Sequence, residues 1–256
     1  FDAAQLPTRW YFAEGTTRTG FEEWLCIQNP QESEVEVKVN YYTTSAVQEE
    51  AYHIDPRHRF TVNVNEEVAR LWPEEREQDV SLKVEASAGV IAERPMYFAY
   101  MGDWDGGDTV VGATRLGREW YLAEGYCQWN FDTWLCFLNP EQEPAHVAIN
   151  YRRGDGALLP HQDLVVAGLS RQTVYVNEVA GFGEFSFHIT SDRDIMVERP
   201  VYFNYKYMWP GGHDNKGLEE ASASWHLAEG STRKGIETYL RCQDALASSK
   251  PLLSWP

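Results

Sequence analysis

Residues 10–15 read Trp-Tyr-Phe-Ala-Glu-Gly, and nearly the same six residues return as Trp-Tyr-Leu-Ala-Glu-Gly at 120–125 and Trp-His-Leu-Ala-Glu-Gly at 225–230. The hexapeptide therefore recurs about every 105–110 residues, which is too long a period for a solenoid unit and suits a self-sufficient domain. The chain is expected to be a tandem duplication followed by a partial third copy.

The first two copies match far beyond the hexapeptide. Residues 24–26 (Trp-Leu-Cys) match residues 134–136, and residues 93–98 (Glu-Arg-Pro-Met-Tyr-Phe) match Glu-Arg-Pro-Val-Tyr-Phe at 198–203. Further matched positions are Asn29 with Asn139, Arg59 with Arg171, and Gly106 with Gly211. We assign residues 1–115 to the first copy, 116–222 to the second copy, and 223–256 to a truncated third copy made of a hairpin and a tail.

Apolar and polar residues alternate with a period of two within each copy. The alternation covers residues 35–41, 60–64 and 80–85 in the first copy, and 147–151 and 185–189 in the second. Such a pattern indicates strands with one buried and one solvated face. About seven short strands per copy, separated by turn residues, are typical of an antiparallel sandwich. The predicted fold is all-β: two tandem immunoglobulin-like antiparallel β-sandwiches plus the partial third repeat.

Two finer expectations follow from the same pattern. Residues 65–71 are the one segment expected to form a helical turn. The hexapeptide strand and the Trp-Leu-Cys strand after it are expected to pair as neighbours, because only the short loop at 16–20, or 126–130 in the second copy, separates them.

The charge of the chain excludes some classes of partner. The sequence holds 22 basic and 39 acidic residues, a formal charge of −17, and such a surface repels phosphate backbones, so nucleic acid is not an expected partner. No apolar run has the length of a membrane span. Because the chain begins at Phe1 without a methionine or signal peptide, we expect a processed or excised piece of a longer protein.

The four cysteines show no C-x-x-C spacing, which argues against a zinc ribbon or a thioredoxin-like site. Cys26 and Cys136 occupy the same position of the repeat, where a small buried thiol is expected rather than a disulfide.

The hexapeptide, the run Phe21–Pro30 and the Glu-Arg-Pro-Met-Tyr-Phe stretch resemble tandem repeats of large bacterial surface-exposed proteins. The resemblance covers nearly all of residues 9–245. It implies extracellular, β-rich display modules on a bacterial cell surface, and it implies no catalytic residues.

The glutamate of the hexapeptide lies inside an apolar strand in each copy. A carboxylate buried there needs a partner, and each complete copy supplies one arginine in an equally apolar strand. We therefore predict two structural ion pairs, Glu14 with Arg94 and Glu124 with Arg199. The alternative makes Glu14 and Glu93 the paired acid and base of a glycoside hydrolase, which requires both carboxyls to face one cleft.

Exposed tryptophans raise the alternative of sugar binding. Aromatic rings on a flat sheet can stack on sugar rings, and the candidates are Trp24, Trp134, Trp104 and Trp129. The competing interpretation is that these rings pack against a loop or against the next copy.

Two loops carry recognisable motifs. Asp103, Asp105 and Asp108 place three carboxylates on a Gly-rich stretch that could bind Ca²⁺, although the matched stretch of the second copy lacks two of them. The tripeptide 153–155 (Arg-Gly-Asp) resembles an adhesion motif, but hairpin-turn chemistry accounts for it.

The residues together favour a non-catalytic extracellular repeat module that acts as a surface spacer, display or adhesion element. The alternatives are a carbohydrate-binding module and, further behind, a glycoside hydrolase. The expected partners are neighbouring repeats of the same protein, with glycans or other surface proteins as further candidates. No cofactor is expected apart from the possible Ca²⁺.

Overall fold

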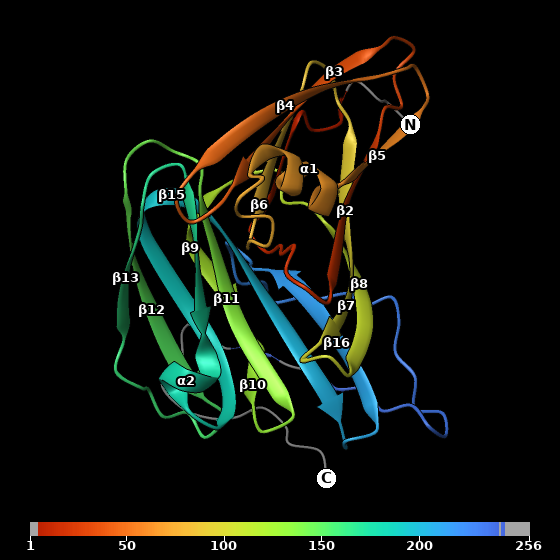
Figure 1. The fold of residues 1–256 in the computed structure, drawn as a ribbon. Coiled ribbons are helices and arrows are strands. Elements are labelled where there is room, and N and C mark those ends of the chain that lie inside the picture. The colour runs from red at the N-terminus through yellow and green to blue at the C-terminus, as the bar shows by residue number, and fades with distance from the viewer. Residues whose placement is uncertain (1–4, 241, 244–256) are drawn as a thin grey trace.

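The computed structural model describes residues 5–240 and 242–243. It is built almost entirely of antiparallel strands, with two short helices (Figure 1). The first copy contains β1 (Arg9–Phe12), β2 (Phe21–Gln28), β3 (Val35–Tyr42), β4 (Val47–Ile54), β5 (Arg59–Asn63), α1 (Val64–Leu71), β6 (Ser81–Ala86), β7 (Ile91–Tyr100) and β8 (Trp104–Val111). The second contains β9 (Gly117–Leu122), β10 (Tyr126–Cys127), β11 (Phe131–Asn139), β12 (Ala145–Arg153), β13 (Gln162–Val166), β14 (Ser170–Tyr175), α2 (Val176–Ala180), β15 (Gly183–Tyr205) and β16 (Trp209–Lys216).

The strands of the first copy form two four-stranded sheets, in the orders β1-β6-β3-β4 and β5-β2-β7-β8. Apolar side chains from both sheets meet in one core. Phe12, Val37 and Leu82 come from the first sheet and Leu25 and Val62 from the second, and these five side chains are at most 4% exposed. The alternation read from the sequence is therefore the alternation between this core and solvent.

The second copy repeats this pairing with one difference. β15 is a single strand of 23 residues, which pairs with β9 and β12 through its first half and with β11 and β16 through its second. The two sheets β9-β15-β12-β13 and β14-β11-β15-β16 are thereby joined, with β10 also paired to β15, into one eight-stranded sheet. In the first copy the same path is divided into β6 and β7 by residues 87–90.

The all-β, antiparallel and sandwich-like prediction is confirmed, and α1 forms where the helical turn was predicted. Asn63 caps α1 by accepting a hydrogen bond from the Glu66 N–H at 3.2 Å. The immunoglobulin-like strand order is not found. Immunoglobulin sheets hold the first and second strands side by side, whereas β1 pairs with β6 and β2 lies in the opposite sheet.

For the same reason the expected pairing between the hexapeptide strand and the Trp-Leu-Cys strand is wrong. The loop at 16–20 carries the chain across the core from one sheet to the other, and the first copy has eight strands instead of about seven. Alternation reports which residues face a core, and it does not report which strand lies alongside.

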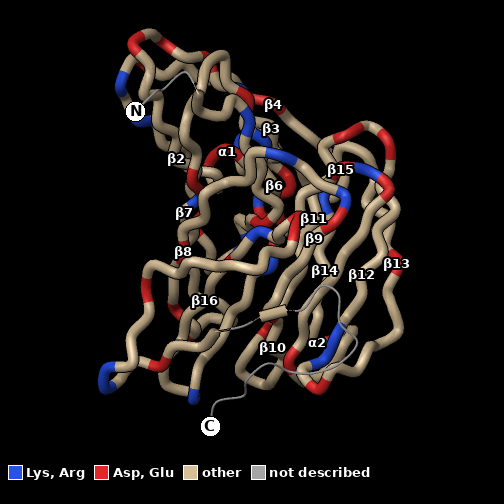
Figure 2. The backbone as a smooth tube through the Cα atoms, turned by 180° about the vertical axis from the view of Figure 1, so that it is seen from behind, with Lys and Arg blue, Asp and Glu red and all other residues tan. Residues whose placement is uncertain are grey.

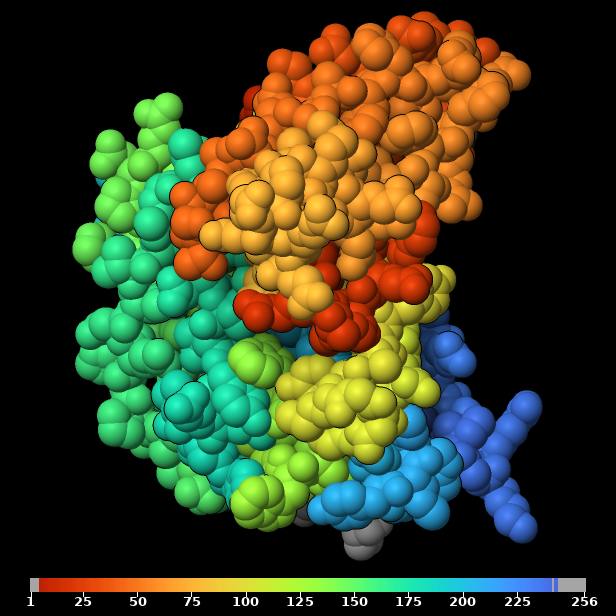
Figure 3. Space-filling model, viewed as in Figure 1, coloured from red at the N-terminus to blue at the C-terminus, as the bar shows by residue number. Residues whose placement is uncertain are grey.

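The two copies pack directly on one another, as the continuous surface in Figure 3 shows. β8 lies against β16, near the middle of Figure 1. Tyr11, Ala13 and Ala113 of the first copy belong to the core cluster of the second. A smaller cluster joins Met96 and Phe98 to Tyr202, and the rings of Tyr100 and Tyr202 stack at 4.4 Å. The boundary between the copies is therefore a packed interface.

Candidate functional site

Charged residues of the repeated motifs gather where the two copies meet, and Figure 2 shows acidic and basic backbone segments close together in the middle of the molecule. Glu14, directly after β1, is 6% exposed and Arg94 of β7 is 1% exposed. Glu198, from β15 of the second copy, is fully buried beside them. We call Glu14, Glu23, Arg94, Glu198 and Asp214 the buried cluster.

Arg94 is the centre of the buried cluster. Its guanidinium donates to the main-chain carbonyl of Glu14, to Glu198 Oε2 at 3.3 Å and to Asp214 Oδ2 at 2.7 Å. Both carboxylates belong to the second copy. The expected ion pair between Arg94 and the Glu14 carboxylate is therefore not formed, because two acids from the neighbouring copy take its place.

The Glu14 carboxylate is held by uncharged donors instead. Cys136 Sγ donates to Oε2 at 2.7 Å, and the Tyr202 hydroxyl donates to Oε1 at 3.0 Å. Burial raises the pKa of the Cys136 thiol and of the Tyr202 phenol well above their ordinary values, and the Glu14 charge adds to both shifts. Both groups keep their protons, so each can serve as a donor to the carboxylate.

Glu198 ties the main chain of one copy to the other. Its Oε2 accepts hydrogen bonds from the Ala13 N–H at 2.8 Å and the Glu14 N–H at 2.6 Å. The main chain of Asp214 is bound to the first copy in turn, because its N–H donates to Asp108 Oδ2 at 2.6 Å. Burial raises the pKa values of Glu198 and Asp214; the charge of Asp214 adds to the shift of Glu198, and Arg94 opposes both shifts. Of the two coupled acids, Asp214 is the more strongly ionised partner of Arg94. The hexapeptide thus contributes its backbone as well as its side chains.

Glu23 is fully buried in β2, facing the cluster. No side chain in the described residues hydrogen-bonds to either of its carboxyl oxygens. Burial raises the pKa of Glu23 to about 8, although the nearby Arg94 lowers it. The carboxyl is therefore protonated at neutral pH, which reduces the excess of negative charge around Arg94.

A second arginine donates hydrogen bonds across the interface beside the buried cluster. Arg171 of β14 is 2% exposed, and it donates to Ser81 Oγ at 3.1 Å and to the Ala13 carbonyl at 3.5 Å. Asp79 lies 3.5 Å from its Nη1. All three partners belong to the first copy.

Glu124 and Arg199, the equivalent pair of the second copy, are brought together. Arg199 Nη1 lies 3.2 Å from Glu124 Oε2, and His213 Nε2 lies 3.6 Å from the same oxygen. Burial and the neighbouring Arg199 lower the pKa of His213. The Glu124 side chain is 31% exposed, and Glu229, its equivalent in the third copy, is exposed.

Sequence reasoning missed Glu23, Cys136, Glu198, Tyr202 and Asp214 as members of this site. Glu23 could have been found, because it shares the alternation of Leu25 and Ile27 and so had to face the core. The other four lie across an interface whose existence no local pattern reports.

The hydrolase alternative finds no support in this geometry. Glu14 is buried with its carboxylate held by Cys136 and Tyr202, whereas Glu93 is exposed on the other face of β7. Paired glycosidase carboxylates must share one cleft that admits substrate and water. These two do not.

The four candidate tryptophans lie in different environments. Trp134 stacks on Tyr175 at 4.3 Å and packs against the Met96–Phe98–Tyr202 cluster between the copies. Trp104 is 9% exposed beside Tyr100, and Trp129 is 79% exposed with its ring edge against Phe182. Trp24 lines a pocket.

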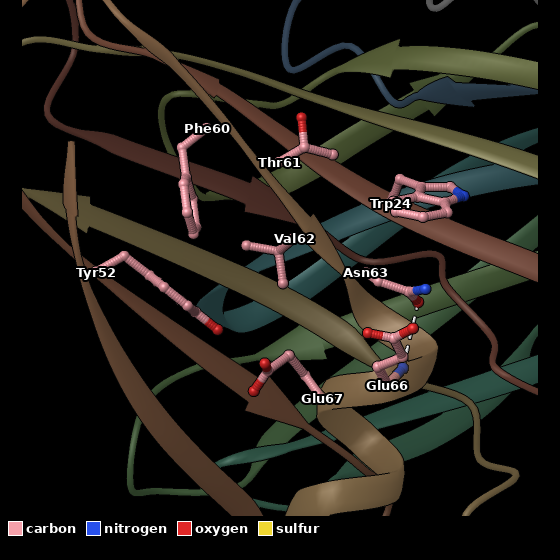
Figure 4. A pocket seen from close by; sticks show the side chains of 8 residues that line it. All are labelled: Trp24, Tyr52, Phe60, Thr61, Val62, Asn63, Glu66 and Glu67. Atoms are coloured by element: carbon pink, nitrogen blue, oxygen red, sulfur yellow. Dashed lines mark hydrogen bonds between the residues drawn. The ribbon is translucent and has the colours of Figure 1, made fainter. Parts of the chain in front are cut away.

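The Trp24 pocket has a volume of about 280 Å³ (Figure 4). Its walls are Trp24, Tyr52, Phe60, Thr61, Val62, Asn63, Glu66 and Glu67, from β2, β4, β5 and the first turn of α1. At the equivalent positions of the second copy, Gln172 replaces Phe60 and Tyr175 replaces Asn63, and Trp134 stacks on Tyr175.

The proposed calcium ligands do not converge. Asp103 lies in the turn after β7. Asp105 and Asp108 are three positions apart along β8, so their side chains project to opposite faces of the strand. No group of three or more acidic, histidine or cysteine side chains able to hold a metal occurs in the described residues. In the 153–155 tripeptide, Arg153 ends β12, and Gly154 and Asp155 lie in the turn that follows.

The four cysteines are free. Within the described part of the chain, no helix has the length and apolar character needed to cross a membrane.

Neither a protein-family model nor a curated protein matches the chain. Solved structures similar to parts of it include Thermotoga maritima 1070, with 14% identity and a TM-score of 0.38 over 41% of this chain and 95% of that one. A second is the Anabaena sensory rhodopsin transducer, with 26% identity and a TM-score of 0.30 over 34% of this chain and 99% of that one. A calcium-binding mutant of Bacteroides uniformis β-glucuronidase 2 covers 81% of this chain and 26% of its own, with 9% identity and a TM-score of 0.16.

Replacing Arg94 by Met is expected to lower the free energy of unfolding by about 3–5 kcal/mol, because Glu198 and Asp214 then stay buried without their cation. Urea unfolding followed by circular dichroism measures the loss. The control is Arg193→Met, an exposed arginine whose loss should change stability by less than about 0.5 kcal/mol. Equal effects of the two substitutions would show that the buried cluster carries no such coupling.

Replacing Glu23 by Gln is expected to change how stability depends on pH. Unfolded Glu23 releases its proton near pH 4.5 and the folded form near pH 8, so the wild type loses stability through this group as pH rises between them. The free energy of unfolding of Glu23→Gln should therefore rise relative to that of the wild type by on the order of 1 kcal/mol per pH unit across that window. Urea unfolding at pH 5, 6.5 and 8, with the exposed neighbour Glu22→Gln as control, tests this; a constant difference from wild type would refute it.

Proposed function

We propose that the chain is a non-catalytic repeat module in which two β-sandwich copies, 1–115 and 116–222, are fixed against each other to form a surface spacer, display or adhesion element. One observation carries this proposal. The charged residues of the repeated motifs, Arg94 and Glu198 above all, make their contacts across the boundary between the copies.

The physics of the buried cluster suits such a role. Motion between domains is the ordinary expectation unless their interface is large and apolar. Here an apolar contact around Tyr202 is combined with directional hydrogen bonds from the Ala13 and Glu14 backbone to Glu198. A buried ion pair adds little net stability, yet it penalises any arrangement that leaves its charges unpaired. The cluster thus favours one relative orientation of the copies.

The resemblance to repeats of bacterial surface proteins supports an extracellular location and neighbouring repeats as the natural partners. The charge of −17 fits a module that remains soluble at high local density on a surface. Glycans and other surface proteins are the further partners that a display element would meet.

Small-angle X-ray scattering tests whether the copies are held rigidly. The full chain is expected to give one narrow distance distribution that is the same at 0.1 and 1 M NaCl (about 10 and 3 Å Debye length), because buried charges are screened little by salt. Arg94→Met should broaden the distribution, and Arg193→Met should leave it unchanged. A broad distribution for the wild type would contradict the spacer proposal.

A carbohydrate-binding function is the second candidate, and the Trp24 pocket is the observation that favours it. Trp24, Tyr52 and Phe60 supply aromatic surface, while Asn63 and Glu66 supply polar atoms at the rim (Figure 4). Aromatic faces with a few polar groups are the usual composition of small-molecule sites. Against this, Trp134, the equivalent of Trp24, packs between the copies.

A glycan array followed by titration calorimetry decides between the two candidates. If the pocket binds sugars, Trp24→Ala should reduce affinity at least tenfold, whereas Trp129→Ala, an exposed ring outside the pocket, should not. Absence of binding across a broad glycan panel would remove this function and leave the spacer proposal unaffected.

A further inference from the structure

Equivalent residues of the two copies differ sharply in exposure on one face. In the second copy, Cys136, Arg171, Glu198 and Tyr202 are between 0 and 4% exposed. Their equivalents in the first copy are open to solvent: Arg59 and Glu93 are exposed, Cys26 is half-buried and Tyr97 is 57% exposed. We call Trp24, Cys26, Arg59, Glu93 and Tyr97 the outer face of the first copy.

The burial of this face in the second copy has an identifiable cause. The first copy covers it: Glu14 accepts from Cys136 and Tyr202, Arg94 donates to Glu198, and Ser81 accepts from Arg171. The outer face of the first copy therefore carries the same kinds of side chain in the same arrangement, without the cover.

The contact between the copies is heterologous. Tyr202 of the second copy binds Glu14 of the first, but Tyr97 does not bind Glu124 in return, since it is largely exposed. A contact that joins two different surfaces does not close on itself and leaves each surface available at one end of the assembly. The outer face of the first copy is such a surface.

One hydrogen bond between the first and second copies has an equivalent between the second and third copies. The Tyr100 hydroxyl of the first copy donates to Asp132 of the second at 2.8 Å, and the equivalent Tyr205 hydroxyl of the second copy donates to Glu237 of the third. Asp132 and Glu237 occupy matched positions, two residues before Trp134 and Tyr239. The described residues of the third copy thus begin to dock on the second copy as the second docks on the first.

We propose that the outer face of the first copy binds the Glu124–Arg199 side of a second copy of this chain, head to tail. The proposal rests on the proposed function as a repeat module and names its partner. Glu93 would then meet Arg199 as Glu198 meets Arg94, and Tyr97 would face Glu124 as Tyr202 faces Glu14. On this side the Glu124 side chain is 31% exposed, whereas the Arg199 side chain beside it is 4% exposed, so Glu124 is the group that an incoming Tyr97 reaches first.

The third copy of the same chain competes for that side. Glu237 is bound by Tyr205 and Lys206, and Tyr239 lies within hydrogen-bond distance of Tyr205 at 2.7 Å. These residues occupy the position that a docking outer face requires. Weakening them should therefore increase association between chains.

Sedimentation equilibrium at 0.15 M NaCl tests the proposal, since this salt screens the repulsion between chains of charge −17 beyond about 8 Å. The full-chain double variant Glu237→Ala/Tyr239→Ala should show a mass that rises with concentration without stopping at a dimer. Both replaced side chains are exposed, so the fold should be retained. Adding Glu93→Arg, which opposes Arg199, should weaken the association at least tenfold.

The matched control is Glu36→Arg in the same double variant. It makes an equal charge change at an exposed position of β3, in the other sheet, and should leave association unchanged. A mass that stays monomeric in the double variant, or association that Glu93→Arg weakens no more than Glu36→Arg does, would overturn the proposal. Scattering from the dilute monomer separates the two ideas: a narrow distance distribution retains the spacer proposal even when head-to-tail association fails.

Discussion

One guanidinium organises the middle of this molecule. Arg94 belongs to the first copy, yet its carboxylate partners Glu198 and Asp214 come from the second, and its third acceptor is the carbonyl of Glu14. Because a buried cation without counterions is very costly, the second copy has to lie where it does for the first copy to keep this arginine inside. The glutamate of the hexapeptide is set by the same arrangement, its backbone facing Glu198 and its carboxylate facing Cys136 and Tyr202.

The repeated motifs consequently act on two sides of each copy. One side presents a hexapeptide strand end and an arginine, and the opposite side presents a cysteine, a glutamate and a tyrosine. In Glu-Arg-Pro the glutamate and the arginine are adjacent, so a strand points one to each side. Glu93 and Arg94 show this directly, the first exposed and the second buried. Between the two copies, the arginine of the first motif meets the glutamate of the second motif.

The sequence predicted the secondary structure that depends on local pattern, and it did not predict contacts between distant segments. Period-two alternation identified strands such as β3, and the helical turn predicted at residues 65–71 is found as α1, whereas α2 was not predicted. The alternation did not predict which strands pair. β1 and β2 are joined by a short loop and still lie in different sheets. Glu14 and Glu124 lie in nearly identical hexapeptides, yet only the Glu124 carboxylate pairs with the arginine of its own copy, because the neighbouring copy supplies Arg94 with other acids. Differences of this kind arise between copies, where a local pattern carries no information.

The uninterrupted course of β15 has a mechanical consequence. In the second copy one strand of 23 residues belongs to both sheets, so tension along the chain passes from sheet to sheet through continuous hydrogen-bonded backbone. In the first copy residues 87–90 separate β6 from β7, and the same tension has to cross a connection held by two backbone hydrogen bonds, from the Ser87 N–H to the Glu36 carbonyl and from the Val90 N–H to the Pro7 carbonyl. Under load the two sheets of the first copy can therefore part before those of the second, which makes the first copy the yielding element of the pair.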